Sequence, residues 1–184
     1  MWSAAAANGE EPYSLAMELT EVFRRPDPPA TILATDIDED ALTVAECGEY
    51  SELALRALDP RRRARFFSQA GVVGRWRIAP ELRRWLEFRV LNLADVSWPV
   101  EGPFDVIFCR NVLMYLEECH RYAVLERIAS LLASDGMLLL DPAEHLGTAG
   151  QWFSQEVGGV YLRRETAAPR RDRGRASACR GQIR

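Results

Sequence analysis

Two adjacent carboxylates near the start of the chain are the first residues that could do chemistry. Glu10 and Glu11 follow Gly9 and open a stretch with helical apolar periodicity, so they lie in the first turn of a predicted helix. Acids at a helix N-terminus would repel a phosphate group, but they suit a cationic group such as the ammonium of an amino acid. The pair could instead serve only to stabilise the helix dipole, and the residues alone leave both alternatives open.

Polar side chains also follow three apolar runs further along the chain. Asp36 ends the second run, Asn92 follows the third, and Arg110 and Asn111 follow the fourth. If these runs are parallel strands, their carboxyl ends meet at one edge of a sheet, where open α/β folds bind their ligands. An acid after the second strand suits a ribose diol. A ligand with both an ammonium and a ribose is S-adenosylmethionine, and this edge is its predicted site.

Each of these residues also has an ordinary structural alternative. Asp36 could be a turn or capping residue, Asn92 a turn asparagine, Arg110 the partner of a surface acid, and Tyr115 a core residue. The segment "AAAANG" lacks the G-x-G pattern of nucleotide-binding loops and keeps only Gly9. The prediction of one site therefore depends on the four strand ends meeting.

The elements that must position these residues alternate between apolar strands and helices. This alternation predicts an α/β fold with a doubly wound, mostly parallel sheet that has helices on both faces. The predicted helices are one after Gly9 that is closed by Pro26, Pro28 and Pro29, then 38–50, short pieces in 51–68, and 118–133. The predicted strands are 1–6, 31–36, 86–93, 104–109, 136–141 after a turn at 134–136, and 157–164 as an edge strand.

Apolar spacing predicts which helix faces are buried. The first helix presents Leu15, Leu19, Val22 and Phe23 on one face, and the helix 118–133 presents Tyr122, Leu125, Ile128, Leu131 and Leu132. Residues 69–85 alternate at Val73, Trp76 and Ile78 and break at Pro80, which predicts a small β-excursion followed by a helical turn.

Composition and charge narrow the function further. The 184 residues suggest one domain and carry a net charge of −4. Residues 163–184 contribute eight Arg against two acids, so the remainder is acidic, which argues against a nucleic-acid partner. From 166 onward the tail lacks periodicity, and we expect it to be disordered.

Cys47, Cys109, Cys119 and Cys179 show no metal-ligand spacing, so no metal site is predicted and a reduced, cytoplasmic protein fits best. No apolar run is long enough to insert into a membrane.

Four stretches together resemble the catalytic domain of the CheR family, the chemotaxis receptor methyltransferases. They are "WSAAAANGEEPYSLAM", "ATDIDEDALTVAECGEY", "LEFRVLNL" and "GPFDVIFCRNVLMYL", in the family's order and with close to its spacing. The resemblance implies a Rossmann-like, class I S-adenosylmethionine-dependent methyltransferase domain over residues 1–165. It also implies a small inserted β-subdomain at about 69–85, which in some members docks a receptor peptide.

The resemblance also implies roles for single residues. Glu11, with Glu10 beside it, would hold the methionine ammonium of the cofactor, and Asp36 would bind the ribose hydroxyls. The adenine edge would meet Asn92 and Leu93. The first turn would contribute Ala4 and Gly9. Arg110 and Asn111 would line the pocket for cofactor and substrate, and Tyr115 would lie near the transferred methyl group, with Arg110 and Tyr115 as the catalytic residues.

Two departures from the family pattern bear on activity. We expect the chain to lack the N-terminal helical domain that closes over the cofactor in the family and supplies a catalytic arginine. After the fifth strand, only Glu144 of the stretch 141–145 corresponds to the family's Gly-His-Ser-Glu-like segment. His145 is interpreted as a loop residue.

The resulting prediction is methyl transfer from S-adenosylmethionine to glutamate side chains in the cytoplasmic region of chemoreceptors. One alternative is a truncated, non-catalytic module that binds the cofactor or docks on the receptor. Another is a small-molecule methyltransferase of the same fold, against which "GEEPYS" and "CRNVLMY" argue.

Overall fold

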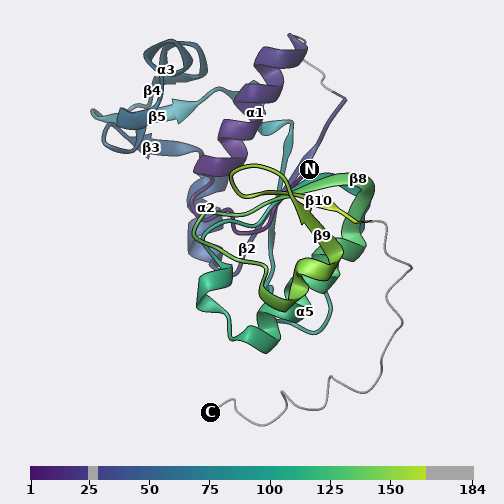
Figure 1. The fold of residues 1–184 in the computed structure, drawn as a ribbon. Coiled ribbons are helices and arrows are strands. Elements are labelled where there is room, and N and C mark those ends of the chain that lie inside the picture. The colour runs from purple at the N-terminus through teal and green to yellow at the C-terminus, as the bar shows by residue number, and fades with distance from the viewer. Residues whose placement is uncertain (25–28, 165–184) are drawn as a thin grey trace.

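A computed structural model describes residues 1–24 and 29–164, and Figure 1 shows how their elements are arranged. A seven-stranded sheet in the order β6-β2-β1-β7-β8-β10-β9 forms the centre. The first five strands in that order are parallel, and β10 is antiparallel to both of its neighbours. The strands are β1 (Trp2–Ser3), β2 (Ile32–Asp36), β6 (Leu86–Val90), β7 (Phe104–Phe108), β8 (Leu132–Leu139), β9 (Phe153–Gln155) and β10 (Val160–Arg163). The predicted α/β fold with a mostly parallel sheet is confirmed.

Helices lie on both faces of this sheet. Successive residues of β2 point to opposite faces, so Ile32 packs with α1 (Glu10–Phe23) and α4 (Pro80–Arg83), whereas Leu33 belongs to the core under α5 (Glu118–Leu131). The face with α1 also carries α2 (Glu39–Cys47), and the face with α5 also carries η3 (Gly147–Trp152). Among the described residues, no helix combines the length and the apolar character that crossing a membrane requires.

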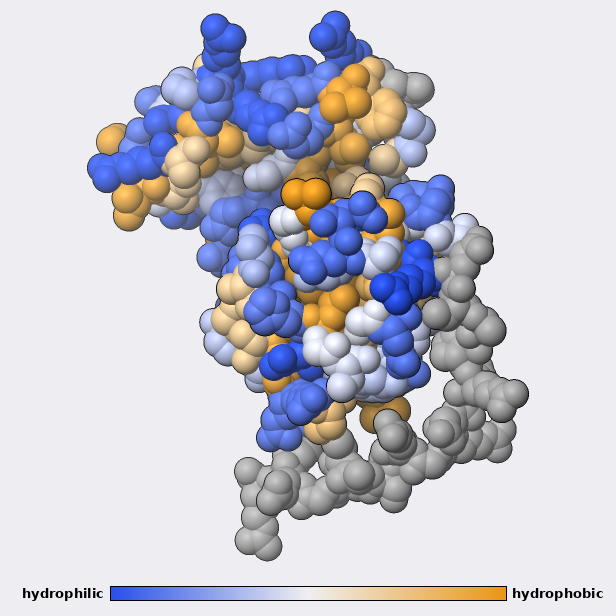
Figure 2. Space-filling view, viewed as in Figure 1, coloured by the Kyte–Doolittle hydropathy of each residue, from blue (hydrophilic) through white to orange (hydrophobic). Residues whose placement is uncertain are grey.

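The helices cover the α1 face unequally. The helices α1 and α2 contact β2 and β6, and α4 contacts β6. On β7 and β8, Val106, Phe108 and Leu139 alternate with buried residues and are only half-buried, and Met137 is exposed. Figure 2 shows apolar residues reaching the surface in the middle of the molecule, between more hydrophilic regions.

A second, three-stranded sheet in the order β3-β5-β4 stands apart from the main one (Figure 1). Its strands are β3 (Glu49–Ser51), β4 (Phe67–Gln69) and β5 (Arg75–Ile78), and η1 (Ala54–Ala57) and α3 (Pro60–Phe66) connect β3 to β4. Arg62 of α3 joins this unit to α1 through ion pairs of 2.6 Å with Glu18 and Glu21.

The small sheet extends beyond the range predicted for it. The sequence placed a β-excursion within 69–85, whereas the strands begin at Glu49, inside the range 38–50 predicted as helix. The helix α2 ends at Cys47 because Gly48 adopts a left-handed conformation, with φ of +59°, and its N–H closes the last turn. A strand of three residues such as β3 is too short to show a period of two in the sequence.

Three further predictions were wrong. The first helix buries Pro12, Tyr13, Ala16 and Met17, and not Val22 and Phe23, whose side chains are 70% and 41% exposed. These two residues lie in the final turn of α1, and Figure 1 shows that this end of the helix extends beyond the main sheet. The predicted closing prolines Pro26 and Pro28 lie outside the described residues.

The other two errors concern the strands near the carboxyl end. The predicted turn at 134–136 is part of β8, because Phe104 pairs with Leu132 and Val106 with Met137, so the extra residues of β8 form an irregularity inside the strand. The predicted edge strand β10 lies between β8 and β9, and the three-residue β9 forms the edge. The tail from 166 onward also lies outside the described residues.

Candidate functional site

The predicted site residues lie where four neighbouring strands end. The chain leaves β1 into a loop and α1, leaves β2 at Asp36, leaves β6 into 91–93, and leaves β7 into 109–115. Because β6, β2, β1, β7 and β8 are parallel, these ends share one edge of the sheet. The structure therefore brings the predicted strand ends together.

Glu11 is the acid of the "GEE" turn that faces the other site residues. Its Oε1 accepts a hydrogen bond of 2.7 Å from the Ser3 hydroxyl, and its Oε2 lies 3.8 Å from Nη1 of Arg110. Burial raises the pKa of the Glu11 carboxyl above its ordinary value, and the Ser3 hydrogen bond and the Arg110 charge oppose that shift. Glu10 is exposed and lines a separate cavity beside Tyr50, so the two acids point to different places.

The loop from β1 to α1 needs glycine at one position. Gly9 has φ of +88°, and a Cβ there would stand 2.8 Å from the Cβ of Ala45. Ala4 helps to hold this loop in place through its backbone. Its side chain is buried, and its N–H donates to the carbonyl of Phe108 at 2.8 Å. The loop is therefore fixed by close packing against α2 and β7.

Asp36 ties this loop to the end of β2. Its Oδ2 accepts from the N–H of Ala7 at 2.8 Å, and its Oδ1 accepts from the N–H of Asp38 at 3.0 Å. An ionised carboxylate offers about four acceptor positions, so Asp36 keeps acceptor capacity for further hydroxyl donors. Asp36 therefore does serve as a turn residue, which was its structural alternative, and it still has acceptor positions for a ligand.

Asn92 and Leu93 lie beside Asp36, since the N–H of Leu91 donates to the Asp36 carbonyl at 2.8 Å. The side chain of Asn92 forms a turn, in which Oδ1 accepts from the N–H of Ala94 at 2.9 Å and Nδ2 donates to Asp95 at 3.2 Å. The side chain of Leu93 is buried in the core under α5. These two residues therefore present mainly backbone to a ligand at this position.

Arg110 stands between two carboxylates. Its guanidinium lies 3.8 Å from Glu11 and 3.6 Å from Asp141, and 43% of its side chain is exposed. Asn111 donates from Nδ2 to the same Asp141 oxygen at 3.3 Å. A backbone hydrogen bond from Ala143, together with Asn111 and Arg110, lowers the pKa of Asp141.

Tyr115 is the last residue of η2 (Leu113–Tyr115), and its side chain is 80% exposed. It follows the Arg110–Asn111 segment on the same loop. Its exposure rules out a core position, which was its structural alternative.

Glu144 also belongs to this site, although no role was predicted for it from the sequence. Its side chain is buried, with 4% exposed, and it accepts hydrogen bonds from four backbone N–H groups in two loops. Its only signal in the sequence is its correspondence to a family glutamate, because its partners at Asn111, Val112 and Leu113 lie more than thirty residues away.

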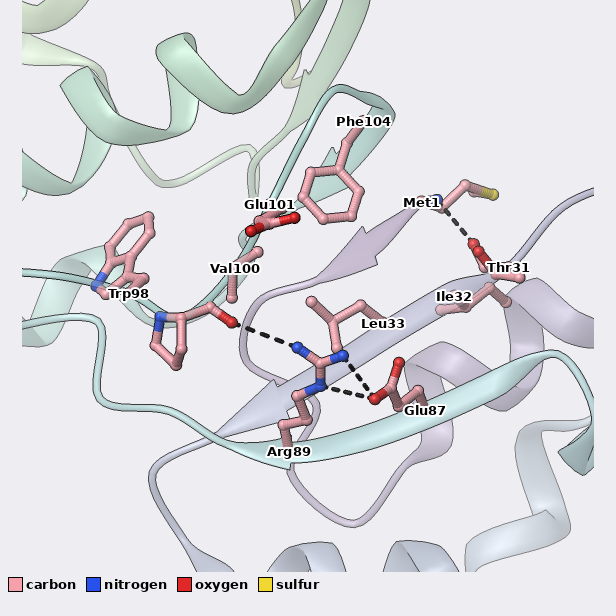
Figure 3. Close-up of a pocket in the computed structure, with 11 residues that line it drawn as sticks. Met1, Thr31, Ile32, Leu33, Glu87, Arg89, Trp98, Val100, Glu101 and Phe104 are labelled. Carbon is pink, nitrogen blue, oxygen red and sulfur yellow. Dashed lines mark hydrogen bonds and ion pairs between the residues drawn. The ribbon is translucent and has the colours of Figure 1, made fainter.

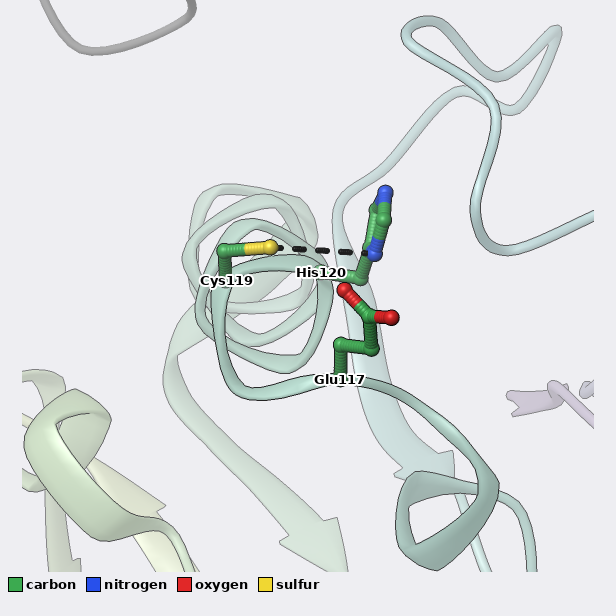
Figure 4. A group of neighbouring side chains, drawn as sticks. All are labelled: Glu117, Cys119 and His120. Atoms are coloured by element: carbon green, nitrogen blue, oxygen red, sulfur yellow. Dashed lines mark hydrogen bonds between the residues drawn. The ribbon is translucent and has the colours of Figure 1, made fainter. Parts of the chain in front are cut away.

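Two other features of the molecule lie outside this site. A cavity of about 470 Å³ lies near the amino ends of the strands, and none of the predicted site residues line it. Figure 3 shows the ion pair Glu87–Arg89 at its wall. Figure 4 shows Glu117, Cys119 and His120, whose ligand atoms all lie within 4.8 Å of one another in the described part of the chain. This trio is largely exposed at the N-terminus of α5, where the helix dipole disfavours a cation.

The donor set at the strand ends fits S-adenosylmethionine. A half-buried carboxylate at Glu11 suits an ammonium, and Asp36 on the adjacent strand end has acceptor capacity for a ribose diol. Acids in the first turn of α1 disfavour a phosphate at the same turn. The arrangement can therefore hold a nucleoside that carries an amino-acid side arm.

Comparisons with known proteins agree with this fit. The family described as "CheR methyltransferase, SAM binding domain" matches residues 1–161. A protein named chemotaxis protein methyltransferase 2 from Pseudomonas aeruginosa is 39% identical over 163 residues, which cover 88% of this chain and 58% of that protein. A chemotaxis protein methyltransferase from Vibrio parahaemolyticus is 43% identical over 150 residues, covering 79% of this chain and 54% of that protein. The chain thus spans between half and two thirds of the length of these relatives.

A solved structure supports the fold. The TehB-like SAM-dependent methyltransferase from Corynebacterium glutamicum superposes with a TM-score of 0.52 at 15% identity, covering 89% of this chain and 79% of that chain. Together, the family match and the relatives show that the chain belongs to the CheR methyltransferase family, as its S-adenosylmethionine-binding domain.

Proposed function

We propose that the chain is the catalytic portion of a protein-glutamate O-methyltransferase that methylates the cytoplasmic region of chemoreceptors. The observation that carries this proposal is the row of charged side chains Glu11, Arg110 and Asp141 at the strand ends, with separations of 3.8 and 3.6 Å. The relatives' names as chemotaxis methyltransferases support it and favour it over a non-catalytic docking module or a small-molecule methyltransferase. A cytoplasmic location follows from such a substrate.

The cofactor would lie across the strand ends. In this proposal Glu11 binds the ammonium, Asp36 binds the ribose hydroxyls, and the backbone at Asn92 and Leu93 meets the adenine edge. The loop at Ala4 and Gly9 would pass close to the methionine arm. Glu10 is a weaker candidate than Glu11, because its side chain is exposed on the other side of the helix start.

Bound S-adenosylmethionine would supply an electrophilic methyl group on a sulfonium. The acceptor glutamate is already ionised at neutral pH, with an ordinary pKa of about 4.3, so the chain needs no strong general base. Its residues would mainly orient the acceptor and exclude water, and good alignment contributes up to about 7–11 kcal/mol.

Arg110 has the position and charge to orient the acceptor. When the ammonium occupies Glu11, Arg110 loses one of its two carboxylate partners and can pair with the acceptor carboxylate. Asn111 and Tyr115 would line the same side, and Tyr115, being exposed, can contact the incoming peptide.

Calorimetric titration with S-adenosylhomocysteine tests the site. We expect Glu11→Gln and Asp36→Asn each to weaken binding by about tenfold or more, since each removes a charged partner that contributes at least 1.4 kcal/mol. Glu10→Gln tests which acid of the pair matters, and we expect it to change affinity by less than about threefold. Unaltered affinity in both Glu11→Gln and Asp36→Asn would contradict the assignment.

A second assay tests the substrate. Labelled methyl groups from S-adenosylmethionine should appear on a receptor cytoplasmic fragment and should be released by mild base, because carboxyl methyl esters are base-labile. Labelling that resists base, or labelling of free metabolites alone, would contradict a glutamate substrate.

A further inference from the structure

Glu144 is a buried carboxylate whose acceptor positions are filled by the protein itself. Oε1 accepts from the N–H groups of Val112 at 2.9 Å and Leu113 at 2.8 Å. Oε2 accepts from the N–H groups of Asn111 at 3.1 Å and Asp141 at 3.0 Å. A carboxylate offers about four such positions, so Glu144 has little capacity left for a ligand.

The loop after β7 needs such a partner. The N–H groups of Asn111, Val112 and Leu113 are consecutive and converge on one side, which is the arrangement that binds anions in protein loops. Asn111 has φ of +59°, a left-handed conformation that costs free energy in a residue other than glycine. Without the carboxylate, the buried N–H of Leu113 and the part-buried N–H groups of Asn111 and Val112 would lose their acceptor, and the loop would relax.

The fourth hydrogen bond joins a second loop to the first. Because the N–H of Asp141 also donates to Glu144, the loop after β8 is held beside the loop after β7. The side chain of Asp141 then reaches Arg110 at 3.6 Å and Asn111 at 3.3 Å. One buried carboxylate thus sets the relative position of both loops and of the polar groups that they carry.

We infer that Glu144 is a positioning residue that holds residues 110–116 in the conformation that presents Arg110, Asn111 and Tyr115 to the cofactor and the acceptor. It acts through backbone hydrogen bonds and touches neither ligand. This inference rests on the proposed function, because it gives Glu144 a purpose only if this loop forms part of the ligand site.

Two substitutions change this contact in different ways. Glu144→Gln keeps the shape of the side chain, but an amide has one acceptor oxygen, and its NH2 group would face N–H donors. Glu144→Asp keeps the charge, but its side chain is one methylene shorter and cannot reach both loops. Ile128→Val, a buried change in the core under α5, serves as a control for a general loss of stability.

The first measurement is amide hydrogen exchange of the full chain without cofactor. In Glu144→Gln we expect exchange at 111–113 to be faster by about tenfold or more, because the three N–H groups lose a charged acceptor. Glu144→Asp should show a smaller local effect, and Ile128→Val should leave 111–113 unchanged relative to the rest of the chain. Unaltered exchange at 111–113 in both Glu144 variants would overturn the inference.

The second measurement is affinity for S-adenosylhomocysteine in the same proteins. We expect affinity to fall in the order wild type, Glu144→Asp, Glu144→Gln, and to stay constant in Ile128→Val. Faster exchange with unaltered affinity would overturn the positioning role. The proposed function would then be judged separately by Glu11→Gln, whose carboxylate lies outside both loops.

Discussion

The two halves of the strand-end site use carboxylates in opposite ways. In the half built by β1, α1 and β2, Glu11 accepts one hydrogen bond and Asp36 accepts two. In the half built by the loops after β7 and β8, Glu144 accepts four and is buried. Glu11 and Asp36 keep acceptor positions for a ligand at the carboxyl-end edge of the sheet. The acceptor positions of Glu144 are all taken by backbone N–H groups of the chain.

Under the proposed function, this difference separates acids that bind the ligand (Glu11 and Asp36) from an acid that holds a loop in place (Glu144). A carboxylate needs free acceptor positions to recognise an ammonium or a diol, and Glu11 and Asp36 have them. A carboxylate that satisfies several consecutive N–H groups fixes a loop, as Glu144 does. The number of backbone donors on each acid, and not its closeness to the site, indicates its role.

Gly9→Ala should produce the largest effect, because it changes the backbone on which the first half depends. The new Cβ would lie 2.8 Å from the Cβ of Ala45, at a φ of +88° that strains any residue with a side chain. We expect a loss of about 3 kcal/mol in the free energy of unfolding, from strain and overpacking together. Urea unfolding measures it.

Gly158→Ala is the matched control for that prediction. The φ of Gly158 is +59° and nothing lies within 4 Å of the added Cβ. The variant therefore has the backbone strain of a left-handed alanine but no steric clash. We expect a loss of about 1 kcal/mol. Equal losses in the two variants would show that the contact with α2 does not fix the first loop.

The sequence predicts the first half of the site better than the second. Gly9, Glu11 and Asp36 stand directly at the ends of apolar runs, so a local pattern marks them. Even so, adjacent residues of a helix point about 100° apart, and the local pattern alone does not distinguish Glu10 from Glu11; only the family resemblance named Glu11 first. That choice depends on which side of α1 faces Ser3 and Arg110.

The second half depends on contacts between distant residues. The N–H groups that Glu144 contacts belong to residues more than thirty positions earlier in the chain. No local sequence pattern shows that these residues lie beside Glu144 in the fold. The same limit explains the strands that were missed. Both β3 and β9 have three residues, and their pairing with β5 and β10 defines them more than their own composition.

Glu11→Gln should alter the pH dependence of ligand binding. Burial raises the pKa of Glu11 above its ordinary value, so the carboxyl takes up a proton at a higher pH than an exposed glutamate does and then loses its attraction for an ammonium. We expect affinity of the wild type for S-adenosylhomocysteine to fall by up to about tenfold for each unit of pH below that raised pKa. Titrations of Glu11→Gln over the same range should be flatter, and identical profiles would contradict the role of Glu11.

The same shift predicts an opposite effect on stability. Because the pKa of Glu11 is higher in the folded chain, its favourable contribution is present below its ordinary pKa and is lost as the pH rises through the raised value. At neutral pH the ionised carboxylate therefore costs stability, and Glu11→Gln should raise Tm slightly while it weakens binding. A lower Tm would show that Glu11 holds the structure as Glu144 does.

Asp141→Asn should produce the smallest effect, because among the site residues the Asp141 side chain contacts only Arg110 and Asn111, and its backbone bond to Glu144 is unchanged. Its pKa is lowered in the folded chain, so its contribution to stability is present above its ordinary pKa of 3.8 and is lost as the pH falls through the lowered value. The Tm difference between Asp141→Asn and the wild type should therefore be visible at neutral pH and shrink in acid. Affinity for S-adenosylhomocysteine should change by less than about threefold, since exposed ion pairs contribute little. A larger loss of affinity would mean that the loop half of the site also binds the ligand directly. Glu144 would then be the only acid of that half whose role is to hold a loop and not to bind the ligand.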